Sequence, residues 1–251
     1  MSTARTPPIG AVPPPISAFT ARERRIIDRL RTPRQVQRFL NALPYNTEPP
    51  PEGATQRTFR GVIQHNSAHC LEAALTAAVI LEQHGWPPLV MSFESIDELD
   101  HVLFVYRQRG KWGSIGRSRD PGLHGRKPVF ATPRALALSY VDEYVDFTGR
   151  ITGYAVADLG EIGNYDWRLS SGNVWKVERM LLDLAHRRLQ TSDARIDRLR
   201  KRYREYRARY GRKPVYYRRM DRWTELPREF TEGTKGTEST TKERSQRRRT
   251  K

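Results

Sequence analysis

The chain has 251 residues, with 45 Lys and Arg against 28 Asp and Glu, which gives a formal net charge of +17. This length predicts one domain of ordinary size with appendages. The longest nearly apolar run, 73–81, is far shorter than the roughly 20 residues of a membrane-spanning helix, so a transmembrane protein is excluded. With its single cysteine, the chain has no internal disulfide framework, and zinc fingers that need two cysteines are excluded as well.

The N-terminal part predicts a leader followed by helices. Residues 1–16 are rich in proline and indicate an unstructured leader. No apolar stretch of signal-peptide length occurs there, so we expect a cytoplasmic protein. Two helices are expected within 17–59, because a Thr-x-x-Glu capping box begins at Thr20 and a Thr-Pro pair at 32–33 begins a second helix. A Pro-rich loop over 45–58 ends this region.

Residues 60–190 alternate helical and strand patterns and predict the central α+β domain. Its strongest helix runs from Cys70 to Gln83, with apolar residues spaced three and four apart. A glycine at position 85 closes it. Strands are expected at 89–93, 101–106, 111–118 and 151–156, and further helices at 132–141 and from Asn173 onward. We therefore expect a helix that begins with cysteine, packed on an antiparallel sheet.

The C-terminal quarter holds most of the positive charge. Residues 191–251 contain 21 Lys and Arg and 9 Asp and Glu. The segment 191–228 predicts a basic helical extension with Ile196 and several tyrosines on one face. The segment 229–251 predicts a disordered basic tail. Such a tail attracts polyanions, so nucleic acid or another polyanion is a candidate partner, with salt-sensitive and sequence-independent binding.

The position of the only cysteine points to chemistry. A thiol at a helix N-terminus lies near unpaired N–H groups and the positive end of the helix dipole, and both favour the nucleophilic thiolate. A cysteine nucleophile also needs a base and a group that orients the base. His101 begins a predicted strand, and Asp120 follows the next one. The sequence therefore predicts a catalytic triad of Cys70, His101 and Asp120.

These motifs resemble the transglutaminase-like superfamily, which shares its core with papain-like cysteine proteases. The matching pieces lie within about 60–130, and they are Cys70-x-x-x-Ala74, Gly85-Trp-Pro-Pro-Leu-Val90, Asp100-His101-Val-Leu-Phe-Val, and Lys111-Trp112 before Asp120-Pro121. The resemblance implies acyl transfer through a thioester. Cys70 would attack an amide or ester carbonyl, His101 would move the proton, and Asp120 would hold the imidazole.

Further site residues follow from this interpretation. An oxyanion donor is needed, and the Cys70 backbone N–H is one candidate. Gln64 is a second, because papain-like enzymes place a Gln at that offset from the cysteine, and Asn66 competes for the role. Trp112 is expected to bind substrate. The resemblance implies no cofactor.

A metal site is the alternative interpretation of the residues before Cys70. His65 and His69 have the i, i+4 spacing of zinc ligands on a helix. This requires 65–69 to be helical, whereas Asn66 and Ser67 look like helix caps. We therefore expect no metal.

Two functional hypotheses follow. The first is a transglutaminase-like cysteine acyl transferase or amide hydrolase that acts on a peptide or amide substrate. The alternative is a non-catalytic binding protein on a degenerate transglutaminase-like fold, whose basic tail binds a polyanion or a protein partner. The first needs an accessible thiol of low pKa, whereas the second needs neither.

Overall fold

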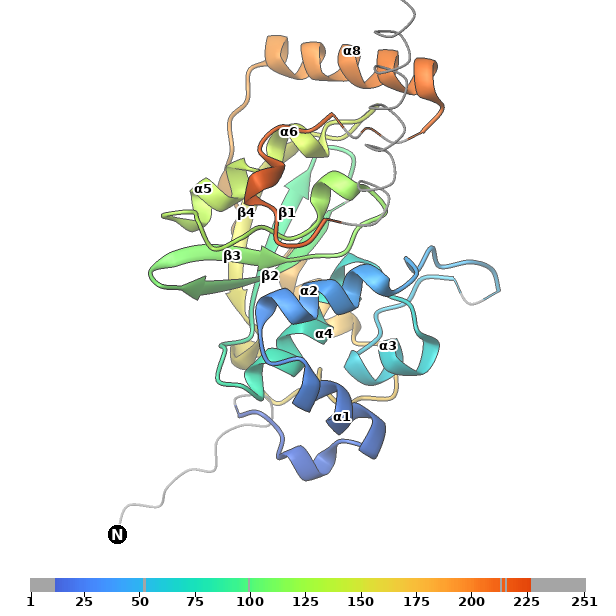
Figure 1. The fold of residues 1–251 in the computed structure, drawn as a ribbon, viewed down its shortest axis with the longest axis vertical. Coiled ribbons are helices and arrows are strands. Elements are labelled where there is room, and N and C mark those ends of the chain that lie inside the picture. The colour runs from blue at the N-terminus through green and yellow to red at the C-terminus, as the bar shows by residue number, and fades with distance from the viewer. Residues whose placement is uncertain (1–11, 52, 99, 213, 215, 227–251) are drawn as a thin grey trace, which may run out of the picture.

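A computed structural model describes residues 12–226 apart from positions 52, 99, 213 and 215 (Figure 1). Helices and a five-stranded antiparallel sheet confirm the predicted α+β class. The helices are α1 (Ala21–Arg29), α2 (Pro33–Ala42), α3 (Phe59–His65), α4 (Cys70–Glu82), α5 (Pro133–Leu138), α6 (Val141–Tyr144), α7 (Trp175–Leu182) and α8 (Asp193–Tyr210). The strands are β1 (Leu89–Ser95), β2 (His101–Gln108), β3 (Lys111–Ile115), β4 (Ile151–Asp158) and β5 (Arg187–Arg188). Most of the leader, and the whole segment predicted as a disordered tail, lie outside the described residues.

The sheet has the strand order β3-β2-β1-β4-β5 and is covered on both faces. Successive side chains of a strand point to opposite faces. In β2, Phe104 and Tyr106 therefore join the cluster around α4, while Leu103 and Val105 join a second cluster with α5 and α6. This double coverage explains why every residue of β2 from His101 to Tyr106 is buried.

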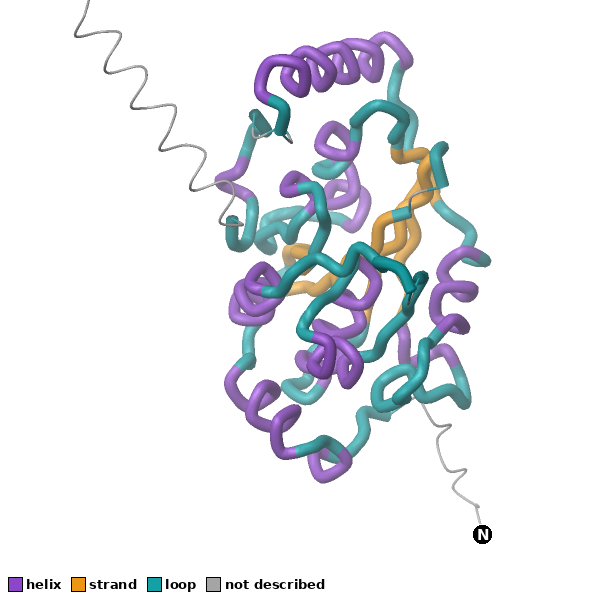
Figure 2. The backbone as a smooth tube through the Cα atoms, turned by 90° about the vertical axis from the view of Figure 1, so that its right-hand side faces the viewer, coloured by secondary structure: helices purple, strands orange, loops and turns teal. Residues whose placement is uncertain are grey.

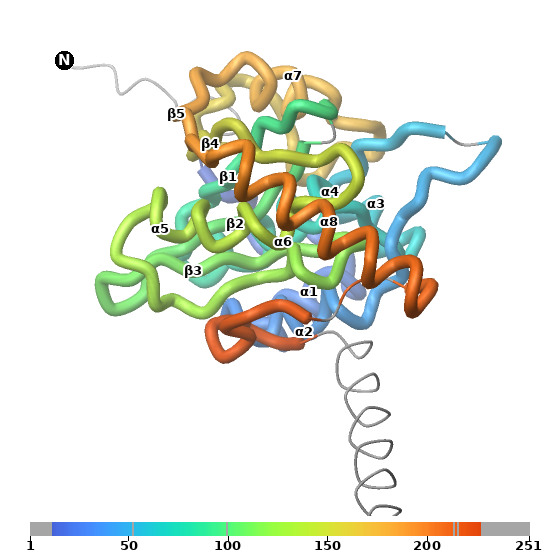
Figure 3. The backbone as a smooth tube through the Cα atoms, turned by 90° about the horizontal axis from the view of Figure 1, so that it is seen from above, coloured from blue at the N-terminus to red at the C-terminus, as the bar shows by residue number. Residues whose placement is uncertain are grey.

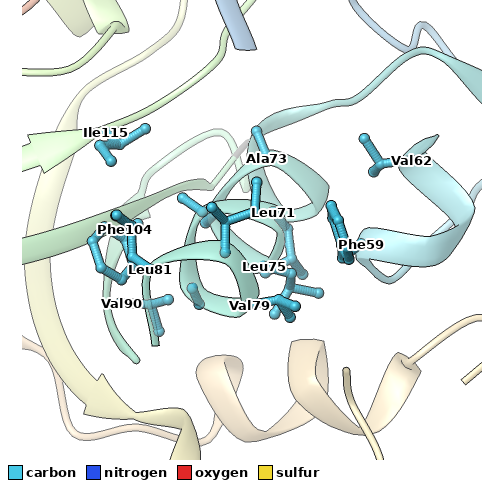
Figure 4. Packing of buried hydrophobic residues seen from close by; sticks show 14 of the residues in the cluster. Phe59, Val62, Leu71, Ala73, Leu75, Val79, Leu81, Val90, Phe104 and Ile115 are labelled. Atoms are coloured by element: carbon cyan, nitrogen blue, oxygen red, sulfur yellow. The ribbon is translucent and has the colours of Figure 1, made fainter. Parts of the chain in front are cut away.

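Helix α4 is buried from Leu71 to Glu82. Figure 1 places α1, α2 and α3 around it, and α2 also contacts β3 of the sheet. Figure 4 places Phe59 beside Leu75 and Val79, while Leu81 lies next to Phe104 of the sheet. Because the helix meets neighbours all round, its sequence is apolar all round rather than amphipathic. Truncation of one fully buried leucine in such a core costs about 2–5 kcal/mol of stability.

The two predicted helix starts at Thr20 and Thr32 are confirmed. Thr20 accepts from the Glu23 backbone N–H while the Glu23 side chain accepts from Thr20, which completes the capping box. Pro33 is the first residue of α2, after the N-cap Thr32. Gly85 has φ of +81°, the left-handed conformation that glycine adopts without strain just after a helix.

Several local predictions are wrong. Helix α3 falls in a stretch for which no helix was predicted. The segment 132–141 forms two short helices rather than one, because the chain breaks between Leu138 and Val141. Asn173 does not cap α7, because its side-chain oxygen accepts from the Gln56 backbone N–H instead. The third strand ends at Ile115, before the predicted end at 118.

Helix α8 lies across one end of the molecule, next to α6 (Figures 2 and 3). Ile196 and Tyr203 are its buried residues, and the Tyr203 ring meets Phe147 edge-on at 5.0 Å between centroids. Arg195 pairs with Asp142 of α6 at 2.7 Å. The predicted packing by one face is thus confirmed at these positions, although Tyr210 at the end of the helix is exposed. Within the described residues, we find no helix of the length and apolarity that crossing a membrane requires.

Candidate active site

A cleft of about 880 Å³ opens at the N-terminal end of α4. Its walls come from the loop over 45–56, the first residues of α4 and β2, the turn between β1 and β2, and the segment 118–123. Cys70, His101 and Asp120 all line it. The fold therefore brings the three residues of the predicted triad to one cavity.

Cys70 is the first residue of α4 and is partly exposed. Burial raises the pKa of its thiol, but hydrogen bonds and positive charge from His101 and His69 lower that pKa well below its ordinary value. The N-terminal end of the helix adds positive potential of the same sense. The surroundings of Cys70 thus favour the thiolate.

His101 is the first residue of β2 and is buried. Its ring stacks in parallel on Phe93, its partner in the β1–β2 register, at 6.3 Å between centroids. Its Nε2 lies 3.0 Å from the Leu123 carbonyl oxygen. Because a carbonyl only accepts, Nε2 carries a proton and donates it, and Nδ1 is left to face Cys70. In the neutral imidazole, Nδ1 is the atom that accepts a proton from the thiol.

Asp120 lies on the edge of the turn that presents this carbonyl. It precedes the 3₁₀ turn Pro121–Leu123, and its backbone N–H donates to the Ser118 hydroxyl at 3.0 Å. The acceptor that fixes the His101 tautomer is the Leu123 carbonyl at the end of this turn. A backbone carbonyl is present at every position, so residue types could indicate the turn but could not identify this acceptor.

A buried arginine holds the same turn. Arg126 donates from Nη2 to the Gly122 carbonyl and from Nη1 to the His124 carbonyl, each at 2.7 Å, on the two sides of the residue that binds His101. Its guanidinium lies over the rings of Tyr140 at 4.2 Å and Trp223 at 4.4 Å. A planar guanidinium is suited to such stacking. Arg126 therefore fixes the carbonyl that orients His101, and the sequence analysis missed it.

His69 is a second imidazole at the thiol, and its role was also missed. Its Nε2–H donates to the Thr55 carbonyl at 2.8 Å, and its Nδ1 accepts from the Leu71 N–H at 3.3 Å. Burial lowers the pKa of His69, but the hydrogen bond and charge of Cys70 and the charge of Glu72 raise it to about 9. Protonation at Nδ1 exchanges the Leu71 contact for a donor to the thiolate. The sequence signal that could have identified His69 is the His-x-x-Glu capping box at the start of α4.

Glu72 is hydrogen-bonded to several groups around the N-terminal end of α4. It is fully buried and accepts from the Asn46 side chain at 3.1 Å, the Thr55 hydroxyl at 2.8 Å and the backbone N–H groups of Arg57 and His69 at 3.1 Å. The nearest guanidinium atom, Arg57 Nε, is 3.9 Å away. His69 Nε2 lies 3.6 Å from the carboxylate, so both positively charged neighbours are beyond the distances of its hydrogen bonds, which come from neutral donors near the helix N-terminus.

The remaining predicted site residues are not brought to the cleft. Gln64 is exposed near the end of α3, and Asn66 is exposed as its left-handed C-cap with φ of +53°. Trp112 pairs with Arg107 in the sheet and forms a bridge with Phe130. None of the three is among the residues that line the cleft. The left-handed residue redirects the chain between α3 and α4, so the residues before it turn away from Cys70.

The zinc interpretation fails for the same reason. His65 is the last residue of α3, while His69 is the N-cap of α4, so the two do not share a helix. Throughout the described part of the chain, no group of three or more His, Cys, Asp or Glu side chains is placed to hold a metal ion.

Comparisons with known proteins add little. No protein-family model and no curated protein matches the chain. Among solved structures, LapG of Legionella pneumophila is similar over 73% of this chain and 93% of its own, with 12% identity and a TM-score of 0.33. Its calcium-bound form covers 66% and 94%, with 13% identity and a TM-score of 0.32. Similarity at this level is distant.

Proposed function

We propose that the protein is a cysteine-dependent amide hydrolase or acyl transferase of transglutaminase-like type, with Cys70 as nucleophile. One observation carries the proposal: a partly exposed cysteine whose thiol pKa is lowered lies at a helix N-terminus, next to two imidazoles, in a cleft. This is the arrangement that turns a cysteine into a nucleophile at neutral pH.

The reaction begins as the Cys70 thiol gives its proton to His101 Nδ1 and the resulting thiolate attacks a substrate carbonyl carbon. A carbon–sulfur bond forms, and the carbonyl oxygen takes the negative charge. We assign the backbone N–H of Cys70 as a donor to that oxygen. When the carbon–nitrogen bond breaks, the His101 imidazolium gives its Nδ1 proton to the departing amine, which leaves an acyl thioester. Water, or a second amine, then gives a proton to His101 and attacks the thioester, and the thiolate is released.

The two histidines have different roles in this proposal. The Leu123 carbonyl fixes His101 in the tautomer that can accept and return a proton at Nδ1. His69 stabilises the thiolate as a cation and is held by the Thr55 carbonyl. Asp120 precedes the turn that ends in Leu123, and it is one of the residues that line the cleft. The proposal keeps Asp120 as the acidic member of the site, while the carbonyl orients the imidazole.

The test is the rate of alkylation by iodoacetamide as a function of pH. Because the chain has one cysteine, every modification reports on Cys70, and Cys70→Ser serves as the unlabelled control. We expect the native thiol to react with an apparent pKa well below the free value of about 8.5. His101→Ala should raise that pKa and lower the turnover of peptidyl aminomethylcoumarin amides by about 10³-fold or more.

His69→Gln separates the two roles. It should also raise the thiol pKa, because a cation next to the sulfur is lost, but it should retain measurable turnover because His101 still transfers the proton. A native thiol that is inert, or that titrates like free cysteine with and without His101, would contradict the proposal and favour a non-catalytic binding protein.

A further inference from the structure

The cleft around Cys70 has a charge opposite to that of the whole protein. Eight of the described residues that line it are Asp or Glu, and Arg119 is the one Arg or Lys among them. The whole chain, by contrast, has a formal net charge of +17. Carboxylates that line a cleft focus their field inside it and raise the local concentration of cations. The cleft is thus a cation-attracting site in a cationic protein.

The carboxylates come from separate parts of the chain. The end of β1 supplies Glu94, and the turn between β1 and β2 supplies Asp97, Glu98 and Asp100. Four other segments supply Glu48, Asp120, Asp146 and Glu178. In the part of the chain that the structure describes, no Lys or Arg forms an ion pair with Glu94, Glu98 or Asp100. Their charges therefore remain available to a ligand.

The carboxylates of Glu94, Asp97 and Asp100 also repel one another. Burial raises the pKa of Asp100, and the charges of Glu94 and Asp97 raise it further, against the opposing effects of the Ser95 N–H and His186. Like charges held close together favour the protonated form of one of them. A cation bound between these carboxylates would remove that cost.

The size and spread of the cleft favour an extended ligand. Its volume of about 880 Å³ lies in the upper part of the range that holds drug-sized ligands. Among the described residues its carboxylates do not converge in threes as metal ligands do. Apolar side chains lie exposed among them, with exposed fractions of 55% for Ile96, 38% for Trp175 and 60% for Leu182. Such surfaces contact the aliphatic stems of Lys and Arg while the charged heads reach carboxylates.

We propose that the cleft binds a segment of a protein rich in Lys and Arg and presents an amide of that segment to Cys70. This inference takes its reactive group from the proposed function and deepens it by naming the substrate class. It also places any nucleic acid outside the cleft, because a polyanion is repelled there.

Peptide binding tests the substrate class without catalysis. The full-length Cys70→Ser protein is titrated into two labelled peptides of equal length, followed by fluorescence anisotropy. One peptide alternates Lys and Arg with Ala and Gln, and the other carries Glu at each basic position. We expect the basic peptide to bind at least about tenfold more tightly, with an affinity that falls as salt increases. Equal affinity for both peptides would overturn the inference.

Neutral isosteres locate the binding charges. The triple substitution Glu94→Gln, Glu98→Gln and Glu178→Gln removes three cleft charges with little change in side-chain volume. It should weaken binding of the basic peptide about tenfold, as expected for the loss of three partly exposed ion pairs. Alkylation of the corresponding variants with cysteine retained should proceed as in the native protein, because none of the three side chains is bonded to the thiol.

A matched control separates the cleft from the overall charge. Asp28→Asn, Glu161→Gln and Glu205→Gln change the net charge equally, and all three residues are exposed outside the cleft. This control should leave the affinity unchanged within about twofold, because screened charges far from the ligand contribute little. An equal loss in both triple variants would mean that only overall charge matters, which would overturn the inference.

Charge-selective thiol reagents report on the cleft through Cys70 itself. A cationic methanethiosulfonate should modify Cys70 at least about tenfold faster than its anionic counterpart at low salt, and the ratio should shrink in the cleft variant. Preference for the basic peptide without any cleavage by the native protein would contradict the proposed function and leave this inference standing. Equal cleavage of basic and acidic peptides would support the proposed function and overturn the inference on the substrate class.

Discussion

Helix α4 has a buried glutamate at each end, and the two ends stabilise it differently. At the N-terminal end, Glu72 is bonded to hydroxyl and amide donors, with the nearest guanidinium atom at 3.9 Å. At the C-terminal end, Glu82 receives two bonds from the Arg168 guanidinium, at 2.6 and 2.7 Å, and that guanidinium lies over the Trp167 ring. One carboxylate is hydrogen-bonded by neutral donors, with His69 Nε2 at 3.6 Å, and the other is hydrogen-bonded by a guanidinium.

The helix dipole explains the difference. It favours negative charge at the N-terminal end and disfavours it at the C-terminal end. Burial raises the pKa of Glu82 even with Arg168 beside it, so this end needs its ion pair. At the other end, Glu72 is hydrogen-bonded by neutral donors with His69 Nε2 at 3.6 Å, and the positive potential of the helix and of two imidazoles acts on Cys70. The C-terminal end of α4 therefore serves stability, and the N-terminal end serves reactivity.

The largest effect is expected at the C-terminal end. Arg168→Met leaves Glu82 buried without its cation and should lower the free energy of unfolding by about 3–5 kcal/mol in urea denaturation. The alkylation rate of Cys70 in the folded protein should not change.

Double substitution gives the control. Replacement of both members, as in Glu82→Leu with Arg168→Met, removes the unpaired charge and should recover most of the lost stability. A change in thiol pKa on Arg168→Met would mean that the two ends of α4 are coupled, and the comparison would fail.

A smaller effect on stability is expected when a glutamate at either end of α4 is replaced by glutamine. Glu72→Gln places amide hydrogens among groups that donate, so it should cost about 1–3 kcal/mol of stability. It also removes a charge that raises the pKa of His69, so that pKa should fall below about 9. An NMR titration of His69 measures it, with Glu82→Gln as the matched control. If both substitutions shift the titration equally, the specific role of Glu72 is wrong.

The smallest expected effect is a pH dependence of the free energy of unfolding, which arises from the pair of Cys70 and His69. In the native state the pKa of His69 is raised to about 9 and that of the Cys70 thiol is lowered well below its ordinary value, so the thiol proton is held by the imidazoles that face the sulfur. In the unfolded state, between about pH 6.5 and 8.5, the proton is on the thiol instead. Both states then hold one proton, so stability does not change with pH in this window. Below it the unfolded imidazole gains a proton, and above it the unfolded thiol loses one, so the contribution falls on both sides.

Urea unfolding of the native protein and of Cys70→Ser measures this contribution as a difference. We expect a plateau between about pH 6.5 and 8.5, and a fall of about 1 kcal/mol from about pH 6.5 to about pH 5.5. A difference that changes steadily through neutral pH would show that the proton is not shared in this way.

The sequence by itself determined the features that depend on neighbours in the chain. The capping boxes at Thr20 and Thr32 and the apolar spacing of α4 specify helices from a few adjacent residues. The same holds for the turn at 109–110, where both residues have positive φ. Cys70 at a helix start and His101 at a strand start could be predicted because each is the end of such an element.

Tertiary structure decided the features that depend on residues far apart in the chain. The acceptor for His101 is a backbone carbonyl, which no residue type marks. The second imidazole gains its raised pKa from the packed thiol and from the carboxylate of Glu72. In the sequence, the acidic residues between β1 and β2 resemble those of an ordinary polar loop. Only the folded structure shows that they line the same cleft as Cys70. Charge and hydrogen bonding act through space, so only the folded chain fixes which distant groups meet, whereas local spacing fixes helices and strands.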